Sequence, residues 1–257
     1  TLVLGAICFT FQIYGDFSGY SDIAIGTSRL FGFNLKQNFA FPYFSRDIAE
    51  FWRRWHISLS TWFRDYLYIP LGGSRGGTWI KVRNTFIIFI VSGFWHGANW
   101  TFIVWGALNA VYFLPLLLTN SNRNNIETIA KGKLIPSIKE VFFTLLTFGL
   151  TVFAWIFFRA ENISHALLFI QDMFTGLTNK EGYIESFNLI YWDIGYALPF
   201  MLLVFIFTEW LGRESQFALQ NIFSRWKWPF RYLLYYAIIM AIFWFSGKEQ
   251  QFIYFQF

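Results

Sequence analysis

The sequence has little charge for its length. Charged residues make up 14% of the 257 residues, whereas 56% are hydrophobic. A soluble domain usually carries about 25% charged residues, so this composition, with a mean hydropathy of +0.41, excludes an ordinary soluble domain. Aromatic residues reach 24%, and Trp and Tyr at this density are typical of the membrane–water interface. We therefore expect an all-α integral membrane protein with several transmembrane helices.

Cysteine is nearly absent as well. Cys8 alone rules out an intrachain disulfide framework and a cluster of thiolate metal ligands. His56, His96 and His165 are far apart in the sequence, and no HExxH or paired CxxC motif accompanies them, so we expect no metal site. The glycine-rich run 72–77 lacks the Lys-Ser/Thr ending of a phosphate loop. No nucleophile elbow accompanies the serines, which makes a serine triad a weak alternative.

Long apolar runs predict where the chain crosses a bilayer, since a spanning helix needs about 20 apolar residues. We predict transmembrane helices at 141–158, 194–211 and 230–245. Residues 1–14 resemble the remainder of another span. Because the chain begins inside an apolar run, we expect a single membrane domain, 1–257, that lacks the N-terminal part of a longer protein.

The basic residues predict which loops face the cytoplasm, where Lys and Arg accumulate. Loop 119–139 holds four basic residues and loop 212–229 holds three, whereas loop 159–193 holds only two. We therefore expect the first two loops on the cytoplasmic side and the third outside.

Two segments do not fit simple spans. Residues 36–83 contain eight basic and three acidic residues interleaved with aromatics, which predicts interfacial or re-entrant helices. Residues 84–118 are too long for one crossing and are interrupted by the polar residues 96–99. We expect a broken helix that carries His96 on a re-entrant piece, because the flanking segments then lie on the same side.

His96 is the first candidate for chemistry. An ionisable residue inside an apolar run is costly and indicates function. The flanking Gly93 and Gly97 permit a bend, Trp95 is placed to exclude water, and Asn99 is placed to orient the imidazole ring or a substrate carbonyl. A buried structural histidine is the alternative.

His56 is the second candidate. If residues 48–59 form one helix, Trp52 and His56 share a face, and Glu50 is spaced to pair with Arg53 and Arg54. Desolvation and nearby positive charge would keep His56 neutral and able to act as a base or acceptor. A structural histidine at an interfacial helix is the alternative.

Four blocks of the sequence form a pattern. They are Tyr14-Gly15-Asp16-Phe17-Ser18-Gly19-Tyr20-Ser21-Asp22, Asn38-Phe39-Ala40-Phe41-Pro42-Tyr43, residues 52–73 from Trp52-Arg53-Arg54-Trp55-His56 to Pro70-Leu71-Gly72-Gly73, and Gly93-Phe94-Trp95-His96-Gly97-Ala98-Asn99-Trp100. These blocks resemble the membrane-bound O-acyltransferase (MBOAT) family, and most closely its alginate O-acetyltransferase-like branch. Gly15 departs from the family pattern, because many relatives carry an apolar residue there.

The resemblance implies an MBOAT-type core in a bacterial inner membrane, with His96 as the catalytic histidine and His56 as the second histidine. The implied reaction moves an acyl group, most simply acetyl, from a cytosolic thioester donor such as acetyl-CoA or an acyl carrier, with no tightly bound cofactor. Its acceptors would be hydroxyls of a cell-envelope polysaccharide such as alginate, reached through a periplasmic or extracellular acyl-accepting partner protein. No nucleic-acid partner is expected.

Roles within that reaction follow as expectations. His96 would act as general base, and His56, Asn99 or a backbone N–H would stabilise the oxyanion. Arg53 and Arg54 would attract an anionic donor or anchor their helix at the interface. Two other functions stay open: D-alanyl transfer toward teichoic acid, and a transporter or channel whose histidines relay protons.

Overall fold

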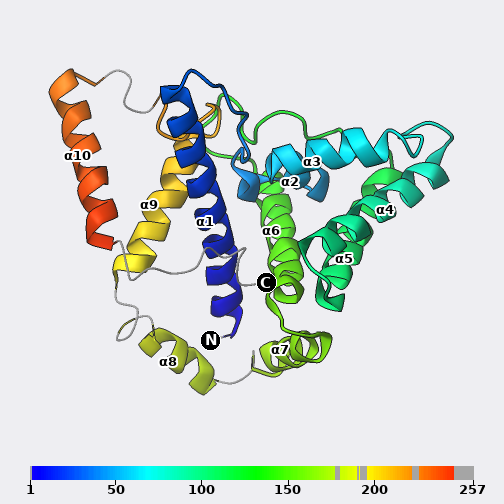
Figure 1. Ribbon diagram of the computed structural model, residues 1–257. Helices are drawn as coiled ribbons and strands as arrows, with labels where there is room; N and C mark the ends of the chain where they lie inside the picture. Colours follow the sequence, from blue (N-terminus) through cyan, green and yellow to red (C-terminus); the bar gives the residue numbers. More distant parts are fainter. Residues whose placement is uncertain (1, 177–179, 190, 192–195, 222–225, 246–257) are drawn as a thin grey trace.

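The protein is built from α-helices and short helical turns. The computed structural model describes residues 2–176, 180–189, 191, 196–221 and 226–245, and no strand occurs among them. Long helices stand beside one another, and short helices lie across one end of them (Figure 1). The elements are α1 (Leu2–Leu30), η1 (Pro42–Phe44), α2 (Ile48–Arg54), α3 (Ile57–Phe63), η2 (Arg64–Tyr68), α4 (Thr78–His96), α5 (Trp100–Leu118), α6 (Ile138–Arg159), α7 (Ile163–Gly176), α8 (Lys180–Asn188), α9 (Ala197–Gly212) and α10 (Trp228–Phe245).

Four of the described helices, α1, α5, α6 and α10, are long and apolar enough to cross a membrane. The all-α membrane fold is therefore confirmed. Predicted span 141–158 lies within α6, and 230–245 lies within α10. Residues 194–195 of predicted span 194–211 lie outside the described residues. The rest of that span corresponds to α9, whose 16 residues are fewer than the about 20 that a crossing needs.

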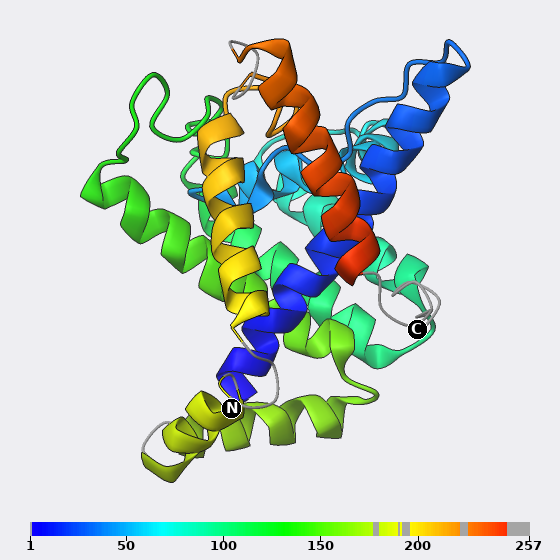
Figure 2. The same cartoon turned by 90° about the vertical axis from the view of Figure 1, so that its left-hand side faces the viewer.

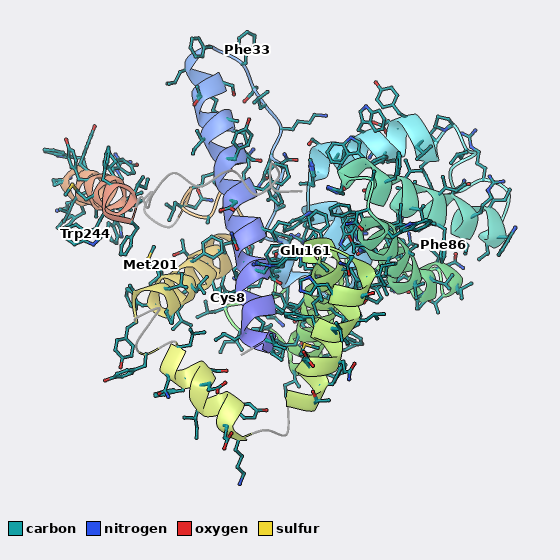
Figure 3. The ribbon with its side chains drawn as sticks, turned by 60° about the horizontal axis from the view of Figure 1, so that its bottom comes forward. Cys8, Phe33, Phe86, Glu161, Met201 and Trp244 are labelled. Atoms are coloured by element: carbon teal, nitrogen blue, oxygen red, sulfur yellow. The ribbon has the colours of Figure 1, made fainter. Side chains whose placement is uncertain are left out.

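Helix α10 stands apart from the other long helices (Figure 3). None of its described residues is buried, and Trp244 near its end is 82% exposed. An apolar helix that touches so little protein is suited to hydrocarbon surroundings rather than to water.

Helix α1 extends well beyond the apolar run at its start. We predicted residues 1–14 as the end of a span, but the helix continues to Leu30 through the Gly-, Ser- and Asp-rich segment 14–22. Such residues favour turns when isolated, and tertiary contacts override that preference here. Tyr14 is buried and donates a hydrogen bond of 2.5 Å to Glu209 Oε1 on α9.

The predicted broken helix over 84–118 is a hairpin of α4 and α5 (Figure 1). His96 is the last residue of α4, and the break occupies residues 97–99. Helix α4 begins at Thr78, earlier than predicted, so each arm has 19 residues and a length of about 28 Å. The basic segments before and after 84–118 were expected on the same side of the membrane. A hairpin of two nearly spanning helices places them there, as a re-entrant loop would.

Two glycines allow the arms of the hairpin to touch backbone to backbone. A Cβ atom on Gly93 would lie 2.3 Å from the carbonyl oxygen of Phe102, and one on Gly106 would lie 2.2 Å from that of Phe89. Any larger residue would push the helices apart. Gly93 and Gly106 therefore set the helix spacing that positions the turn after His96.

The predicted continuous helix through His56 is wrong. Helix α2 ends at Arg54, the next residue is extended, and His56 directly precedes α3 with φ 44° and ψ 55°. Trp52 and His56 therefore do not share a helix face. The break is stabilised from outside the helix, because the Asn38 carbonyl accepts a hydrogen bond of 2.9 Å from the Ile57 N–H.

Aromatic side chains form much of the core. Trp105 and Trp155 stack with ring centroids 5.7 Å apart, and Phe51 stacks on Trp55 at 5.5 Å. All four rings are at most 2% exposed. We attributed the aromatic excess to the membrane–water interface, but these rings lie between helices.

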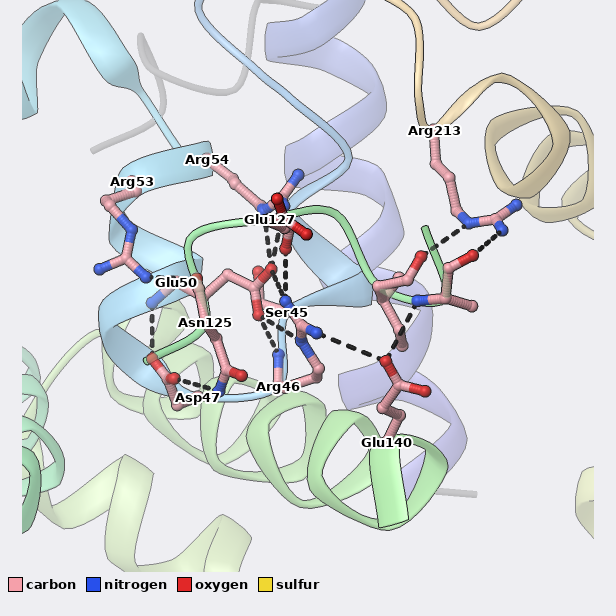
Figure 4. Close-up of polar contacts among 12 residues, drawn as sticks. Ser45, Arg46, Asp47, Glu50, Arg53, Arg54, Asn125, Glu127, Glu140 and Arg213 are labelled. Atoms are coloured by element: carbon pink, nitrogen blue, oxygen red, sulfur yellow. Dashed lines mark hydrogen bonds and ion pairs between the residues drawn. The ribbon is translucent and has the colours of Figure 1, made fainter. Parts of the chain in front are cut away.

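A buried ionic cluster closes the end of the bundle that carries the short helices (Figure 4). Glu50, with its side chain 1% exposed, pairs with Arg46 at 3.0 Å and with Arg54 at 2.9 Å. Arg46 also reaches Glu140 on α6 at 3.4 Å. Asp47 caps α2 by accepting a hydrogen bond of 2.7 Å from the Glu50 N–H. The predicted pairing of Glu50 with Arg54 is present within this cluster.

The two most basic loops meet at the same end. The Arg213 guanidinium donates to the carbonyls of Ile129 and Ala130 at 3.1 Å each, and Glu214 accepts from the Gly132 N–H at 2.8 Å. Helices α7 and α8 lie at the opposite end, beside the start of α1 (Figures 1 and 2). This arrangement agrees with the separation of loops predicted from their Lys and Arg content.

Candidate active site

His96 lies in a cage of aromatic rings. Its ring meets Trp95 and Phe158 edge-on at 5.0 Å and Trp105 edge-on at 5.2 Å, and Phe102 lies 6.3 Å away. These rings come from both arms of the hairpin and from α6. The imidazole therefore occupies a largely apolar environment, which favours its neutral form.

His56 occupies the break between α2 and α3. Its positive φ is uncommon for a residue with a side chain. The ring meets Phe17 of α1 edge-on at 4.7 Å, and its Nδ1 lies 3.3 Å from Asn38 Oδ1 and 3.4 Å from Ser58 Oγ. Burial lowers the pKa of His56 to about 4, so the ring is neutral at neutral pH. We expected neutrality, although desolvation rather than nearby positive charge is its cause.

Both histidines line one cavity of about 290 Å³. The residues that line this cavity include Trp52, Trp105 and Trp155. The structure thus brings together the two histidines that we predicted as catalytic, although they come from different segments. Trp52 contributes to the cavity despite the helix break, and its indole N–H donates to Asn109 Oδ1 at 3.2 Å.

Three arginines also line this cavity, namely Arg53, Arg64 and Arg123. Arg53 donates to the carbonyls of Asn122 and Asn125 at 2.9 and 2.7 Å. It therefore ties α2 to the loop that follows α5, while remaining at the cavity wall.

Arg54, which we predicted beside Arg53 as donor-binding or anchoring, is not among the residues that line this cavity. Its Nε donates to Glu50 at 3.1 Å, and its Nη1 donates to the Ala40 carbonyl at 3.1 Å. The structure therefore places Arg54 in the ionic cluster of Figure 4.

A second cavity, of about 910 Å³, lies beyond the turn of the hairpin. Gly97, directly after His96, lines it together with Gln12 of α1, Arg159 of α6 and His165 of α7. Trp155 lines both cavities. Consecutive residues, His96 and Gly97, therefore border two spaces that lie toward opposite ends of the bundle.

The remaining predicted site residues lie around the turn. Trp95 contacts the His96 ring but is 54% exposed. Asn99 caps α5 by accepting from the Thr101 N–H at 3.1 Å, and it donates to the Glu161 carbonyl at 2.7 Å. Asn99 lines the second cavity rather than the histidine cavity, so its amide group lies on the far side of the turn from the position that we expected.

Asn38, Phe17 and Ser58 contact His56, and none was predicted as a site residue. Asn38 and Phe17 precede His56 by many residues and reach it only through the fold. Both lie inside blocks that resemble the MBOAT family, and that resemblance was the sequence feature that could have identified them. Among the described residues, no group of three or more His, Cys, Asp and Glu is placed to hold a metal ion.

Comparison with known proteins identifies the family of this chain. The model of the membrane-bound O-acyltransferase family (MBOAT) matches residues 2–158, a segment that carries both histidines and most of both cavity walls. The chain belongs to the MBOAT family. The resemblance carried by the sequence blocks is therefore confirmed.

Named relatives fall into three groups. The chain is 42% identical to a probable alginate O-acetylase AlgI of Pseudomonas aeruginosa, over 79% of this chain and 37% of that protein. It is 35% identical to a peptidoglycan O-acetyltransferase of Helicobacter pylori, over 98% of this chain and 48% of that protein. It is 31% identical to a teichoic acid D-alanyltransferase of Bacillus subtilis, over 61% of this chain and 40% of that protein. The chain thus spans less than half the length of these MBOAT relatives.

Proposed function

We propose that this MBOAT chain carries the acyl-transfer centre of a membrane O-acyltransferase, with His96 as general base. The observation that carries the proposal is that His96 lines one cavity together with His56, while the next residue, Gly97, lines the other cavity. Such a position allows an acyl donor and a hydroxyl acceptor to approach one catalytic group from opposite ends of the bundle. A bacterial inner membrane, with the basic loops on the cytoplasmic side, is the proposed location.

The donor is proposed to use the histidine cavity. Arg123, at its wall, belongs to the basic loop that follows α5, and Arg53 and Arg64 lie at the same cavity. Guanidinium groups bind phosphate well, and the thioester donors acetyl-CoA and acyl carriers both bear phosphate. Their acyl group would extend past the aromatic wall toward His96.

In the transfer step, neutral His96 takes the proton of the acceptor hydroxyl while the hydroxyl oxygen attacks the thioester carbonyl carbon. The tetrahedral intermediate then collapses, the carbon–sulfur bond breaks, and the imidazolium returns its proton to the thiolate. The products are an ester and a free thiol, and His96 is again neutral. General-base assistance of this kind is typically worth about 10²- to 10⁴-fold in rate.

The acceptor is proposed to use the second cavity, at the end that carries α7. Asn99 and Arg159 are the polar groups on its wall that lie at the hairpin turn and at the end of α6. The acceptor would be a hydroxyl of a cell-envelope polysaccharide such as alginate, reached through a periplasmic or extracellular acyl-accepting protein. The names of the three relatives support this class and leave acetyl and D-alanyl transfer as outcomes of an assay.

The test uses inverted membrane vesicles from cells that express the protein and make the polymer. Acetyl-CoA or a D-alanyl carrier, labelled in the acyl group, is added outside, and alkali-labile label in the polymer is counted together with released thiol. Acyl transfer predicts both products in equal amounts. A transporter or channel predicts solute flux with neither product, and that result would remove the proposal.

A further inference from the structure

We propose that Asn38 and Ser58 are positioning residues that hold His56 in the tautomer with its proton on Nδ1. His56 then presents Nε2 as a hydrogen-bond acceptor to the cavity that it shares with His96. The role in acyl transfer rests on the proposed function, whereas the tautomer follows from the contacts of His56 alone.

The Asn38 side-chain oxygen can only accept in this arrangement. It lies 3.1 Å from the Ser58 backbone N–H, which can only donate, and 2.8 Å from Ser58 Oγ, which donates its proton to it. His56 Nδ1 lies 3.3 Å from the same oxygen. A hydrogen bond between them therefore requires a proton on Nδ1.

Ser58 favours the same tautomer of His56, with the proton on Nδ1. Its hydroxyl proton is directed to Asn38, so only the lone pairs of its Oγ remain for His56 Nδ1 at 3.4 Å. Both neighbours of Nδ1 are thus acceptors. The alternative tautomer would place the Nδ1 lone pair against two oxygen atoms, which is repulsive.

The amide nitrogen of Asn38 contacts α1 on the side away from His56. Its Nδ2 donates to Ser21 Oγ at 3.4 Å, and Ser21 is 7% exposed. Phe17, one helical turn earlier on α1, contacts the His56 ring edge-on. Three distant segments therefore converge on one imidazole.

This tautomer decides what a neutral His56 can do. Because Nε2 carries a lone pair, His56 can accept a proton or a hydrogen bond from the acceptor hydroxyl or from His96. It cannot donate to an oxyanion from that nitrogen, which was one of the roles expected from the sequence. We therefore assign His56 to the proton-accepting side of the reaction.

The experiment measures the tautomer directly in the purified protein labelled with ¹⁵N-histidine. The chain has 3 histidines, so His96→Gln and His165→Gln variants assign the signals of His56. The wild type is compared with Asn38→Leu, which removes the acceptor, and with Asn38→Asp, which keeps it. Ser21→Ala is the matched control, because it removes the contact on the other side of the same amide.

We expect His56 to have a protonated Nδ1 in the wild type, in Asn38→Asp and in Ser21→Ala, and a mixture of tautomers in Asn38→Leu. Only Asn38→Leu should lower kcat, by about 10- to 100-fold as for other groups that orient a functional histidine, with little change in KM. Asn38→Asp should recover most of the loss.

A protonated Nε2 in the wild type overturns the proposal, as does an unchanged tautomer in Asn38→Leu. An equal loss of kcat in Ser21→Ala and Asn38→Leu would reduce Asn38 to a structural role and overturn it too. If the wild type transfers no acyl group, the proposed function fails, but the tautomer result stands on its own. Should Asn38→Leu not fold, the wild-type and Asn38→Asp spectra still decide the matter.

Discussion

The rings of His96 and Trp105 meet edge-on with their centroids 5.2 Å apart, across the two arms of the α4–α5 hairpin. Trp105 in turn stacks on Trp155 of α6 and is 1% exposed. The orientation of His96 is therefore set by a rigid aromatic stack rather than by its own short turn.

Replacement of His96 by Gln should abolish acyl transfer, with a loss of at least about 10²-fold. The fold should survive, because the aromatic stack remains. Ester formation from labelled donor measures the first effect, and thermal unfolding in detergent measures the second. Near-normal transfer by a folded His96→Gln protein would exclude His96 as the general base.

The glycine contacts of the hairpin predict a steric effect. Gly106→Ala should lower the free energy of unfolding by about 1–3 kcal/mol and reduce activity, because its Cβ would lie 2.2 Å from the Phe89 carbonyl oxygen. Gly149→Ala in α6 is the matched control, since nothing lies within 4 Å of its Cβ position. That control should be neutral or stabilising by up to about 1 kcal/mol. Equal behaviour of the two variants would contradict the backbone contact.

The buried ionic cluster predicts a large effect of a small change. Glu50→Gln keeps the shape of the side chain but removes the carboxylate that pairs with Arg54 and leaves Arg46 with Glu140 as its carboxylate partner. Loss of one partner of a buried pair typically costs about 3–5 kcal/mol, which a fall in the unfolding temperature would report. Glu127→Gln is the control: its pair with Lys131 is 70% and 61% exposed, so it should change stability by less than about 1 kcal/mol.

The pKa of His56, lowered by burial to about 4, predicts the pH dependence of stability. An unfolded histidine has a pKa of about 6.5. Between that pH and about 4, His56 is therefore protonated in the unfolded chain and neutral in the folded protein. The free energy of unfolding should therefore fall as pH falls from about 6.5 to about 4, by up to roughly 1.4 kcal/mol per pH unit. His56→Gln should lose this part of the slope in unfolding experiments. Identical slopes in both proteins would count against a buried neutral His56.

The cationic cavity wall predicts a change in donor binding. Arg123→Gln should raise KM for a phosphate-bearing donor about two- to fivefold, the range expected for one exposed charge pair, with kcat nearly unchanged. The difference should shrink at high salt, because exposed charges are screened. A lower kcat at unchanged KM would instead connect Arg123 to the chemical step.

Much of the fold could be predicted from local sequence. The apolar runs in α6 and α10 and the polar break after His96 produce strong signals, because hydrophobic length and an isolated ionisable residue do not depend on the rest of the chain. Helix α1 was underestimated beyond residue 14, since its Gly, Ser and Asp residues favour turns in isolation, and the hydrogen bond from Tyr14 to Glu209 on α9 joins positions far apart in the chain.

The candidate site was predicted only in part. His96 and His56 stand in blocks that resemble the MBOAT family, and these blocks led to their prediction. Asn38 and Phe17 contact His56 from distant segments, and local sequence patterns do not predict which distant segments meet. The helix break at His56 has the same origin. It depends on a backbone hydrogen bond from Ile57 to Asn38. Asn38 lies outside the segment 48–59, so the helical spacing within that segment could not predict the break.

The sequence by itself determined that this is a helical membrane protein with a histidine at a break in an apolar segment, because composition and hydrophobic length are local properties. Only the tertiary structure decided that His96 and His56 share a cavity, that Arg54 supports the fold while Arg53 lines that cavity, and which nitrogen of His56 its neighbours leave as an acceptor. Those outcomes depend on distances of a few ångströms between segments far apart in the chain, and such distances are set by packing.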